Sequence, residues 1–280
     1  MSIRLMMNCM LGQCGSRFAV ALLVGSMTIA GCSANAPEGS TGSQVPSLEG
    51  RTLVSGVDAT YPPFEYVDAS GKTIGFGVDL ADAICERIQC TVEFQTAEWD
   101  GIFDALAANE FDIVLSSATI TSERSQVVDF TRPYLRAGQV ITVRSDSTIT
   151  NIDDAKSEIV GALEGSTSDL PGFDTKTYET LAAAMQGLIN GEVAATLGEA
   201  IPSLTLVSRD YPGELKVLNQ PFTTEYYGIA VPKSAVDVRE AFDIAITQLD
   251  EDGTLEALAT KWKIPGRAID DLPDEPTFPR

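Results

Sequence analysis

The sequence of 280 residues contains no histidine and has few basic residues, 19 Lys and Arg against 40 Asp and Glu. Histidine is the commonest metal ligand and general base, so its absence excludes histidine-ligated zinc hydrolases and Ser-His-Asp enzymes. The formal net charge of −21 disfavours nucleic-acid binding, because such a surface repels phosphate backbones. The 44% of hydrophobic residues nevertheless suffices for a core, and the length allows one large domain or two lobes.

Long apolar stretches are also missing. The main uncharged apolar run, residues 18–30, is shorter than the about 20 residues that a membrane-spanning helix needs. It fits the apolar part of a secretory signal peptide. The run ends in Ile-Ala-Gly-Cys, which resembles a bacterial lipobox. We therefore expect residues 1–31 to be a signal peptide and Cys32 to carry a lipid anchor; a signal peptide that merely precedes a cysteine is the alternative.

Two segments have a composition that is typical of chain without a packed structure. Residues 32–50 are rich in Ser, Gly, Pro and Ala and almost uncharged, which predicts a flexible lipid-anchored linker with no apolar face to bury. Residues 266–280 are Pro-rich and acidic, which predicts a loose tail.

Only two cysteines, Cys85 and Cys90, lie beyond the predicted anchor. Export favours oxidation, so we expect them to form a disulfide that closes a small loop at a helix end; two buried thiols are the alternative. Two thiols without histidine cannot complete a four-ligand site, so we expect no metal, and no motif predicts a cofactor.

From residue 51 onward, short apolar runs alternate with helical patterns, which favours an α/β fold with mostly parallel sheets. Strands are expected at 52–57, 91–94, 111–117, 139–145, 158–163 and 192–198. Helices are expected at 78–88, 100–109, 180–191, 237–253 and 253–262.

Three polar segments follow predicted strands, where open α/β sheets bind their ligands. Their candidate residues are Asp58 and Tyr61, then Ser116, Ser117, Thr119 and Arg124, and finally Leu163, Ser166 and Thr167. Hydroxyls and amides at a helix start can hold a carboxylate, and the Arg124 guanidinium can bind one in a bidentate manner. Each segment alone is also explained as a helix cap, a surface ion pair or a turn, so the prediction rests on their order.

That order resembles the extracytoplasmic solute-binding proteins of family 3, which supply polar amino acids to ABC transporters. The matching segments are VDATYPPFEY, GKTIGFGVDLADAICERI, WDGIFDAL, FDIVLSSATITSERSQVVDFTRPY and DEDGTLEALATKW. The resemblance spans about residues 51–265. One departure is Gly77, which stands where the family usually has Asp.

The resemblance implies a type II periplasmic-binding-protein fold with two lobes, each a mostly parallel sheet flanked by helices. Two crossover strands, near 136–142 and 222–228, would join the lobes, which close on the ligand like a hinge. Lobe 1 would comprise residues 51–138 and 226–265, and lobe 2 residues 139–225.

The resemblance also assigns roles in binding the amino-acid headgroup. Arg124 occupies the position that binds the α-carboxylate, and Glu199 stands where most members have an Asp that receives the α-ammonium. Glu keeps the charge but is one methylene longer, so the headgroup or the pocket must shift. Further headgroup contacts would come from Ser117 and Thr119 in lobe 1 and from Ser166 and Thr167 in lobe 2.

Tyr61 and Trp99 match positions that flank the ligand side chain, where aromatic faces can bind a cation; Trp99 as a core residue is the alternative. Asp58 matches an acceptor for basic or amide side chains, and Leu163 an apolar neighbour of long cationic ligands. These matches favour Arg, Lys or ornithine, with Gln or His next.

The resemblance thus predicts a non-enzymatic, monomeric receptor of an ABC importer, with a permease as partner. It would be exported and lipid-anchored, on the outer side of the cytoplasmic membrane or in the periplasm. Two alternatives remain: an arogenate or prephenate dehydratase with Glu199 as general acid, and a sensing domain for a separate signalling partner.

Overall fold

The computed structural model describes residues 46–218 and 221–278. The predicted signal peptide and Cys32 lie outside these residues. Among the helices described, none is long and apolar enough to cross a lipid bilayer.

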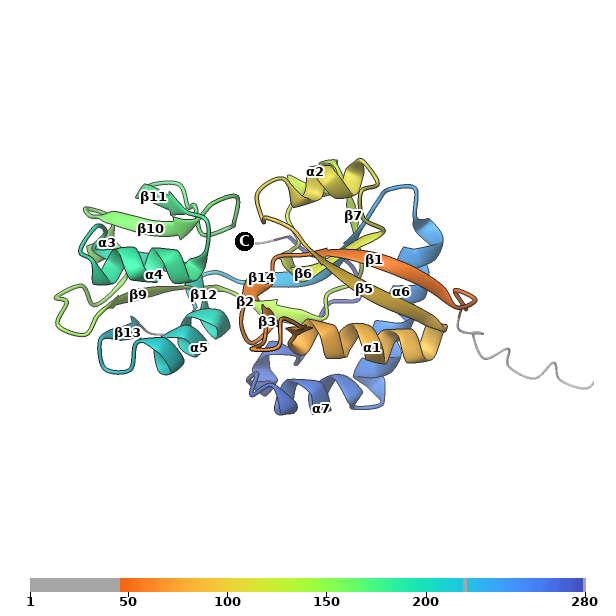
Figure 1. Cartoon of the computed structure of the whole chain (residues 1–280). Coiled ribbons are helices and arrows are strands. Elements are labelled where there is room, and N and C mark those ends of the chain that lie inside the picture. The colour runs from red at the N-terminus through yellow and green to blue at the C-terminus, as the bar shows by residue number, and fades with distance from the viewer. Residues whose placement is uncertain (1–45, 219–220, 279–280) are drawn as a thin grey trace, which may run out of the picture. The chain divides into compact units, whose positions relative to one another are not determined.

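The larger sheet combines parallel and antiparallel strands (Figure 1). β1 pairs in parallel with β5 and β6, whereas β14 is antiparallel to β6, β7 and β8. Every residue of β6 is buried, as is typical of a strand covered on both faces. The strands are β1 (Arg51–Val57), β5 (Cys90–Thr96), β6 (Ile113–Thr119), β7 (Asp129–Phe130), β8 (Leu135–Ala137) and β14 (Glu225–Val231).

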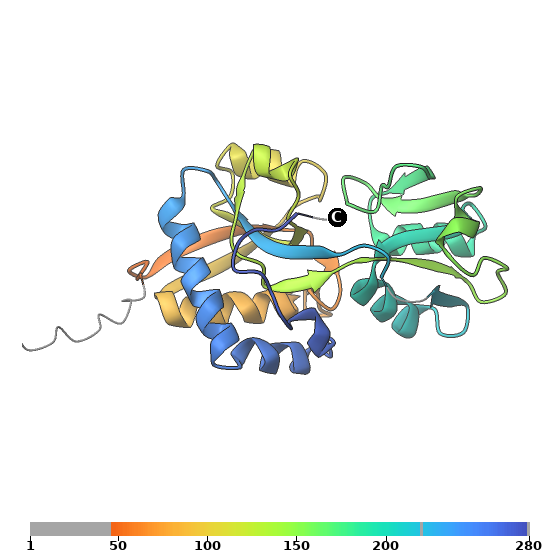
Figure 2. The same cartoon turned by 180° about the vertical axis from the view of Figure 1, so that it is seen from behind.

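Helices cover this sheet on both faces, with α2 on one side and α1 and α7 on the other (Figures 1 and 2). α1 buries Leu80, Ile84 and Ile88, whose spacing of four residues places them on one helical face. The helices are α1 (Phe76–Ile88), α2 (Ile102–Ala107), α6 (Val236–Glu251) and α7 (Thr254–Lys261). We call this sheet with its helices the first lobe.

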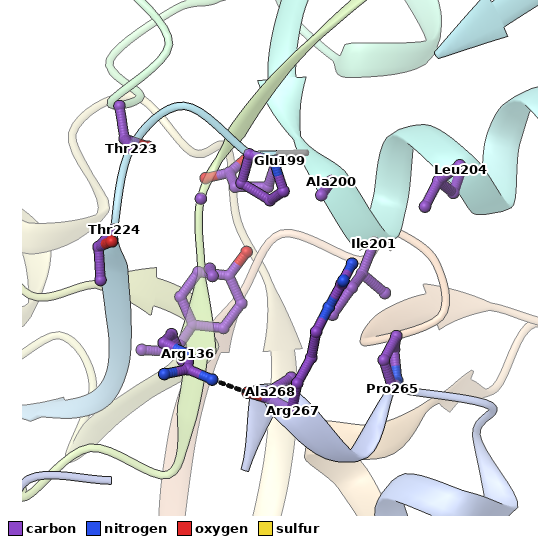
Figure 3. A pocket seen from close by; sticks show the side chains of 14 residues that line it. Arg136, Glu199, Ala200, Ile201, Leu204, Thr223, Thr224, Pro265, Arg267 and Ala268 are labelled. Carbon is purple, nitrogen blue, oxygen red and sulfur yellow. Dashed lines mark hydrogen bonds between the residues drawn. The ribbon is translucent and has the colours of Figure 1, made fainter. Parts of the chain in front are cut away.

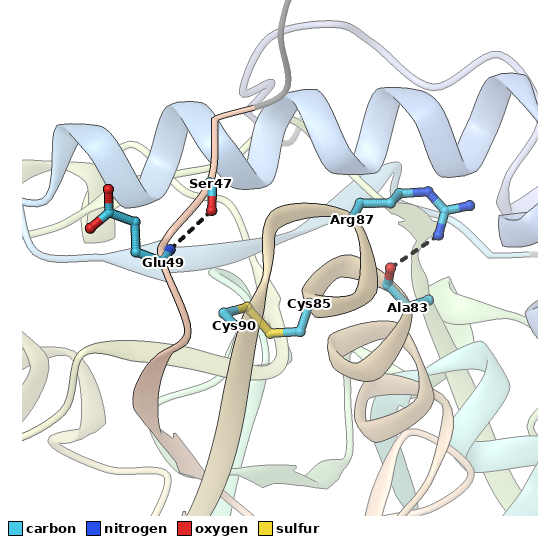
Figure 4. The surroundings of a disulfide bond; sticks show 6 residues. All are labelled: Ser47, Glu49, Ala83, Cys85, Arg87 and Cys90. Atoms are coloured by element: carbon cyan, nitrogen blue, oxygen red, sulfur yellow. Dashed lines mark hydrogen bonds between the residues drawn. A yellow bond between two sulfur atoms is a disulfide. The ribbon is translucent and has the colours of Figure 1, made fainter.

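A disulfide between Cys85 and Cys90 ties the end of α1 to the start of β5, which confirms the predicted pairing (Figure 4). α1 ends because Gln89 adopts a left-handed conformation with φ 57°. The turn and the disulfide together reverse the chain within five residues.

The smaller sheet, with its helices the second lobe, has β10 parallel to β11 and β12, whereas β9 is antiparallel to β12 and β13. Its α4 begins where the Thr180 hydroxyl accepts a hydrogen bond from the amide of Ala183 (3.0 Å) and so caps the helix. The elements are β9 (Gln139–Arg144), α3 (Ile152–Ala155), β10 (Ile159–Leu163), β11 (Asp174–Tyr178), α4 (Leu181–Ile189), β12 (Ala195–Glu199), α5 (Ala200–Asp210) and β13 (Leu215–Leu218).

The chain passes between the lobes at Gly138, between β8 and β9, and returns before β14. The two crossings are hydrogen-bonded: the Gln139 amide donates to Thr223 Oγ1 (2.8 Å), and the Phe222 amide donates to the Gln139 carbonyl (2.9 Å). A Cβ at Gly138 would lie 2.3 Å from the Thr223 carbonyl oxygen, so only glycine permits this close approach.

The structure adds elements that the sequence patterns did not predict. A small antiparallel sheet follows β1, and two 3₁₀ turns occur, Arg124–Gln126 and Gly266–Ala268. The small sheet consists of β2 (Thr60–Tyr61), β3 (Glu65–Val67) and β4 (Thr73–Ile74).

Both segments predicted to be loose are partly packed. Leu48, within the expected linker, is buried and its amide donates to the carbonyl of Ile88 (2.7 Å). In the expected tail, Ala268 and Ile269 are buried, and Asp274 lies 3.4 Å from the Arg132 guanidinium. Composition missed these contacts because one or two apolar residues suffice to anchor such a segment.

Candidate functional site

A small cavity of about 20 Å³ lies where strands of both lobes end. All the predicted ligand-binding residues except Thr167 line it: Asp58, Tyr61, Trp99, Ser116, Ser117, Thr119, Arg124, Leu163, Ser166 and Glu199. The order of polar segments along the chain therefore identified residues that the fold brings together.

Asp58, which follows β1, is fixed at the cavity wall by local hydrogen bonds. Its Oδ1 accepts from the amide (3.1 Å) and the hydroxyl (2.8 Å) of Thr60, and its own amide donates to the Ser116 hydroxyl (2.9 Å). The carboxyl is largely buried, and this burial raises its pKa. A cation in the cavity would stabilise the ionised carboxylate and so compensate for the loss of water around it.

Ser117 occupies the left-handed region with φ 49°, a conformation unusual for a residue other than glycine, asparagine or aspartate. Its hydroxyl donates to Glu65 Oε1 (3.2 Å), and Glu65 is fully buried. A Cβ at Gly77 would lie only 1.9 Å from that oxygen. The glycine at position 77, the departure noted above, therefore leaves the space that the Glu65 carboxylate fills.

Arg124 is held by aromatic rings and by carbonyls of both lobes. Its guanidinium carbon lies 5.0 Å from the centre of the Trp99 ring and 4.7 Å from that of Phe103. Nη1 donates to the Thr119 carbonyl (2.7 Å), and Nη2 donates to the Gly165 carbonyl of the second lobe (3.0 Å). Burial lowers its pKa to about 10, so the group stays charged at neutral pH. The position suits the binding of a carboxylate.

Glu199, the last residue of β12, brings the opposite charge from the second lobe. Its Oε2 accepts a hydrogen bond from the Tyr61 hydroxyl of the first lobe. Burial raises the pKa of Glu199 to about 7, and the nearby Glu225 carboxylate adds to the rise. A cationic group beside Glu199 would stabilise its ionised form.

Glu225, at the start of β14, belongs to the site but was not predicted. It is buried, and its Oε2 accepts from the hydroxyls of Thr119 (3.0 Å) in the first lobe and Thr167 (2.7 Å) in the second. Two residues at the crossings also bond to it, Gln139 at 3.4 Å and Thr223 at 2.9 Å. These contacts explain why Thr167 does not line the cavity. No local pattern distinguishes such an acid, because its partners lie far away in sequence.

Trp99 is half-buried and belongs to the cavity wall, so the interpretation as plain core is incomplete. Its Nε1 donates to the Gly165 carbonyl (3.1 Å), a second contact between the lobes at this residue. The Ser166 hydroxyl bonds within its own loop, where it donates to the carbonyl of Leu163 (2.8 Å).

Within residues 46–218 and 221–278, no group of three or more Cys, Asp or Glu side chains is arranged to hold a metal ion.

The two linked lobes, with a buried cation and buried acids around a shared cavity, define a two-lobed ligand-binding protein. The chain belongs to the bacterial extracellular solute-binding proteins, family 3, whose family model matches residues 53–265. The expected family and fold class are thereby confirmed.

Three proteins illustrate the similarity. The L-cystine-binding protein TcyJ of Escherichia coli strain K12 is 31% identical over 219 residues, 75% of this chain and 82% of that protein. The lysine/arginine/ornithine-binding periplasmic protein of the same strain is 28% identical over 88% of this chain and 96% of its own. A solved structure of an ancestral arginine-binding protein bound to arginine has a TM-score of 0.71 and 35% identity, covering 75% of this chain and 97% of that one.

Proposed function

We propose that this chain is the amino-acid-binding component of an ABC importer and captures its ligand in the cavity between the lobes. The observation that carries the proposal is the placement of Arg124 and Glu199, two buried groups of opposite charge that line the cavity from different lobes. They match the carboxylate and the ammonium of a zwitterion. The names of the similar proteins support this function, since each is described as a binding protein.

The ligand that this cavity favours is a basic amino acid such as Arg, Lys or ornithine, with Gln or His next. Once Arg124 and Glu199 bind the headgroup, the buried Asp58 carboxyl remains to pair with a cationic side chain. Trp99, Tyr61 and Leu163 supply aromatic and apolar wall for an aliphatic stem. Arginine occurs in the names of two of the similar proteins, and lysine and ornithine occur in one of them.

Uptake of labelled L-arginine tests the proposal. Deletion of the gene should abolish high-affinity uptake, and the wild-type gene should restore it, whereas Arg124→Gln should not. Unchanged uptake in the deletion strain would contradict a role in import, and a signalling defect alone would point to the sensor alternative. Product formed from arogenate by the purified protein would instead identify a dehydratase.

The protein acts, we propose, as a monomer attached to the outer side of the cytoplasmic membrane or in the periplasm, where it would present its ligand to a permease. The Ile-Ala-Gly-Cys sequence ending at Cys32 supports a lipid anchor there. Cys32→Ser should release the protein into the soluble fraction, with Cys85→Ser as a control that stays with the membrane. Membrane fractionation of Cys32→Ser would refute the anchor.

A further inference from the structure

A second and larger cavity, of about 260 Å³, lies beside the crossings between the lobes (Figure 3). It shares only Glu199 with the amino-acid cavity. The first lobe supplies Arg136 from β8 and the turn around Arg267, and the second lobe supplies the start of α5. The proposed function uses none of these residues except Glu199.

The charged groups of this cavity are two arginines and one acid, an excess of positive charge that contrasts with the acidic chain as a whole. Arg136 and Arg267 both line it, and Arg136 Nη2 donates to the Arg267 carbonyl, which holds the two residues together at one wall (Figure 3). The positive end of the α5 dipole, at Ala200, lies on the opposite wall. Glu199 is the one acid lining the cavity, and its carboxylate accepts from Tyr61. The cavity therefore favours an anion.

A buried hydroxyl is also available there. Tyr227 lines the cavity and is fully buried, yet its hydroxyl has no hydrogen-bond partner among the described residues. An unpaired buried hydroxyl costs free energy, and a bound acceptor would remove that cost. Burial raises the pKa of Tyr227 well above its usual value, so the hydroxyl keeps its proton and can donate.

The remaining wall is apolar. Ile201 and Leu204 of α5 face Pro265 and Ala268 of the other lobe across the cavity (Figure 3). Leu204 is 50% exposed, although large aliphatic side chains are usually buried. We propose that this cavity is a second binding site, for a small organic monocarboxylate with an aliphatic body. The carboxylate would meet the arginines and Tyr227, and the aliphatic body would cover Ile201 and Leu204.

A ligand held by both lobes would fix the arrangement of the lobes seen here, in which Trp99 and Arg124 contact Gly165 across the amino-acid cavity. Such a ligand stabilises the same arrangement that a bound amino acid requires, so each should raise the affinity for the other by an equal factor. This coupling rests on the proposed function, whereas the second site itself does not.

Isothermal titration of the purified full-length protein tests the site, with hexanoate as the probe. Hexan-1-ol has the same chain without the charge, and acetate has the charge without the chain. We expect hexanoate to bind at least about tenfold more tightly than either, since a charge-assisted hydrogen bond is worth about that factor. Arg136→Gln and Tyr227→Phe should each weaken hexanoate about tenfold. Arg51→Gln, which removes a surface pair with Asp237, should leave it unchanged.

Absence of hexanoate binding, or equal affinity in wild type, Arg136→Gln and Tyr227→Phe, would overturn the second site. Tyr227→Phe keeps the buried ring and so guards against a loss of fold. A repeat titration with saturating L-arginine measures the coupling, and unchanged hexanoate affinity would overturn that part. If L-arginine itself does not bind, the proposed function fails, while the hexanoate titration still decides the second site.

Discussion

The Tyr61 hydroxyl donates a hydrogen bond to the Glu199 carboxylate, which joins residues 138 positions apart in sequence and on different lobes. The bond lies at the wall of the amino-acid cavity, where the resemblance to family 3 places the ligand ammonium. Both side chains are buried, so the neighbouring groups rather than water determine the protonation state of Glu199. We therefore expect ligand binding, closure of the lobes and the protonation of Glu199 to be linked.

Amino-acid affinity should fall as the pH decreases from 8 to 6. Glu199 has a pKa of about 7, so it is mostly ionised at pH 8 and mostly protonated at pH 6, where it no longer attracts an ammonium group. A drop of about tenfold follows if binding requires the ionised form. Titration calorimetry across this range measures it. A flat profile, or an equal loss with a des-amino analogue, would show that another group binds the ammonium.

The contribution of Glu199 to the stability of the ligand-free protein should change with pH in the opposite direction to the affinity. Because the folded protein raises the pKa of this acid from 4.5 to about 7, Glu199 contributes stability below pH 4.5 that is lost as the pH rises to 7. Glu199→Gln should remove this component. Glu225→Gln should lower the pKa of Glu199 by removing a neighbouring charge, and so shift the binding profile to lower pH. An unshifted midpoint would contradict the coupling of the two acids.

Replacing Arg124 should weaken binding even when the charge is kept. Lysine cannot present the planar pair of donors, nor reach the Thr119 and Gly165 carbonyls together, so Arg124→Lys should cost about 10- to 100-fold in affinity. Arg209→Lys, at an exposed pair with Asp210, provides a matched control. Calorimetry with L-arginine compares them, and wild-type affinity in Arg124→Lys would refute bidentate binding.

Removing the disulfide should destabilise the fold without changing affinity. The link between Cys85 and Cys90 closes a short loop far along β5 from the cavity, and chain entropy predicts a loss of about 2 kcal/mol in the free energy of unfolding. Urea unfolding of the double variant Cys85→Ala and Cys90→Ala measures this loss. A reductant should destabilise wild type alone, and weakened ligand binding in the variant would contradict the assigned structural role.

Sequence patterns predicted those helices best whose structure is determined by residues close together in the chain. The apolar spacing in α1 and the Thr180 cap of α4 act within a few residues, so both helices were expected. α5 was not, because Pro202 is unfavourable in a helix interior, yet it lies in the first turn, where the missing amide is tolerated. The strands of the small sheet, β2 to β4, are too short to show a period.

The candidate site was predicted where residues follow strands, and missed where they act through distant partners. Asp58 and Arg124 follow strands and Ser117 lies near the end of β6, and the motif order that resembles family 3 predicted that they share one site. Glu225 gains its role from Thr119 and Thr167, which no sequence pattern relates to it. Thr167 was expected to contact the ligand, but the structure places its hydroxyl on Glu225 instead.

A thermal-shift screen of the purified protein against the twenty amino acids, ornithine and citrulline tests the central claim most directly. A ligand at about 100 times its Kd stabilises by about 2.7 kcal/mol, which raises the Tm measurably. We predict shifts with Arg, Lys or ornithine and a smaller one or none with citrulline, which lacks the side-chain charge. A shift only with small or acidic amino acids would contradict the role of Asp58, and no shift at all would contradict amino-acid binding.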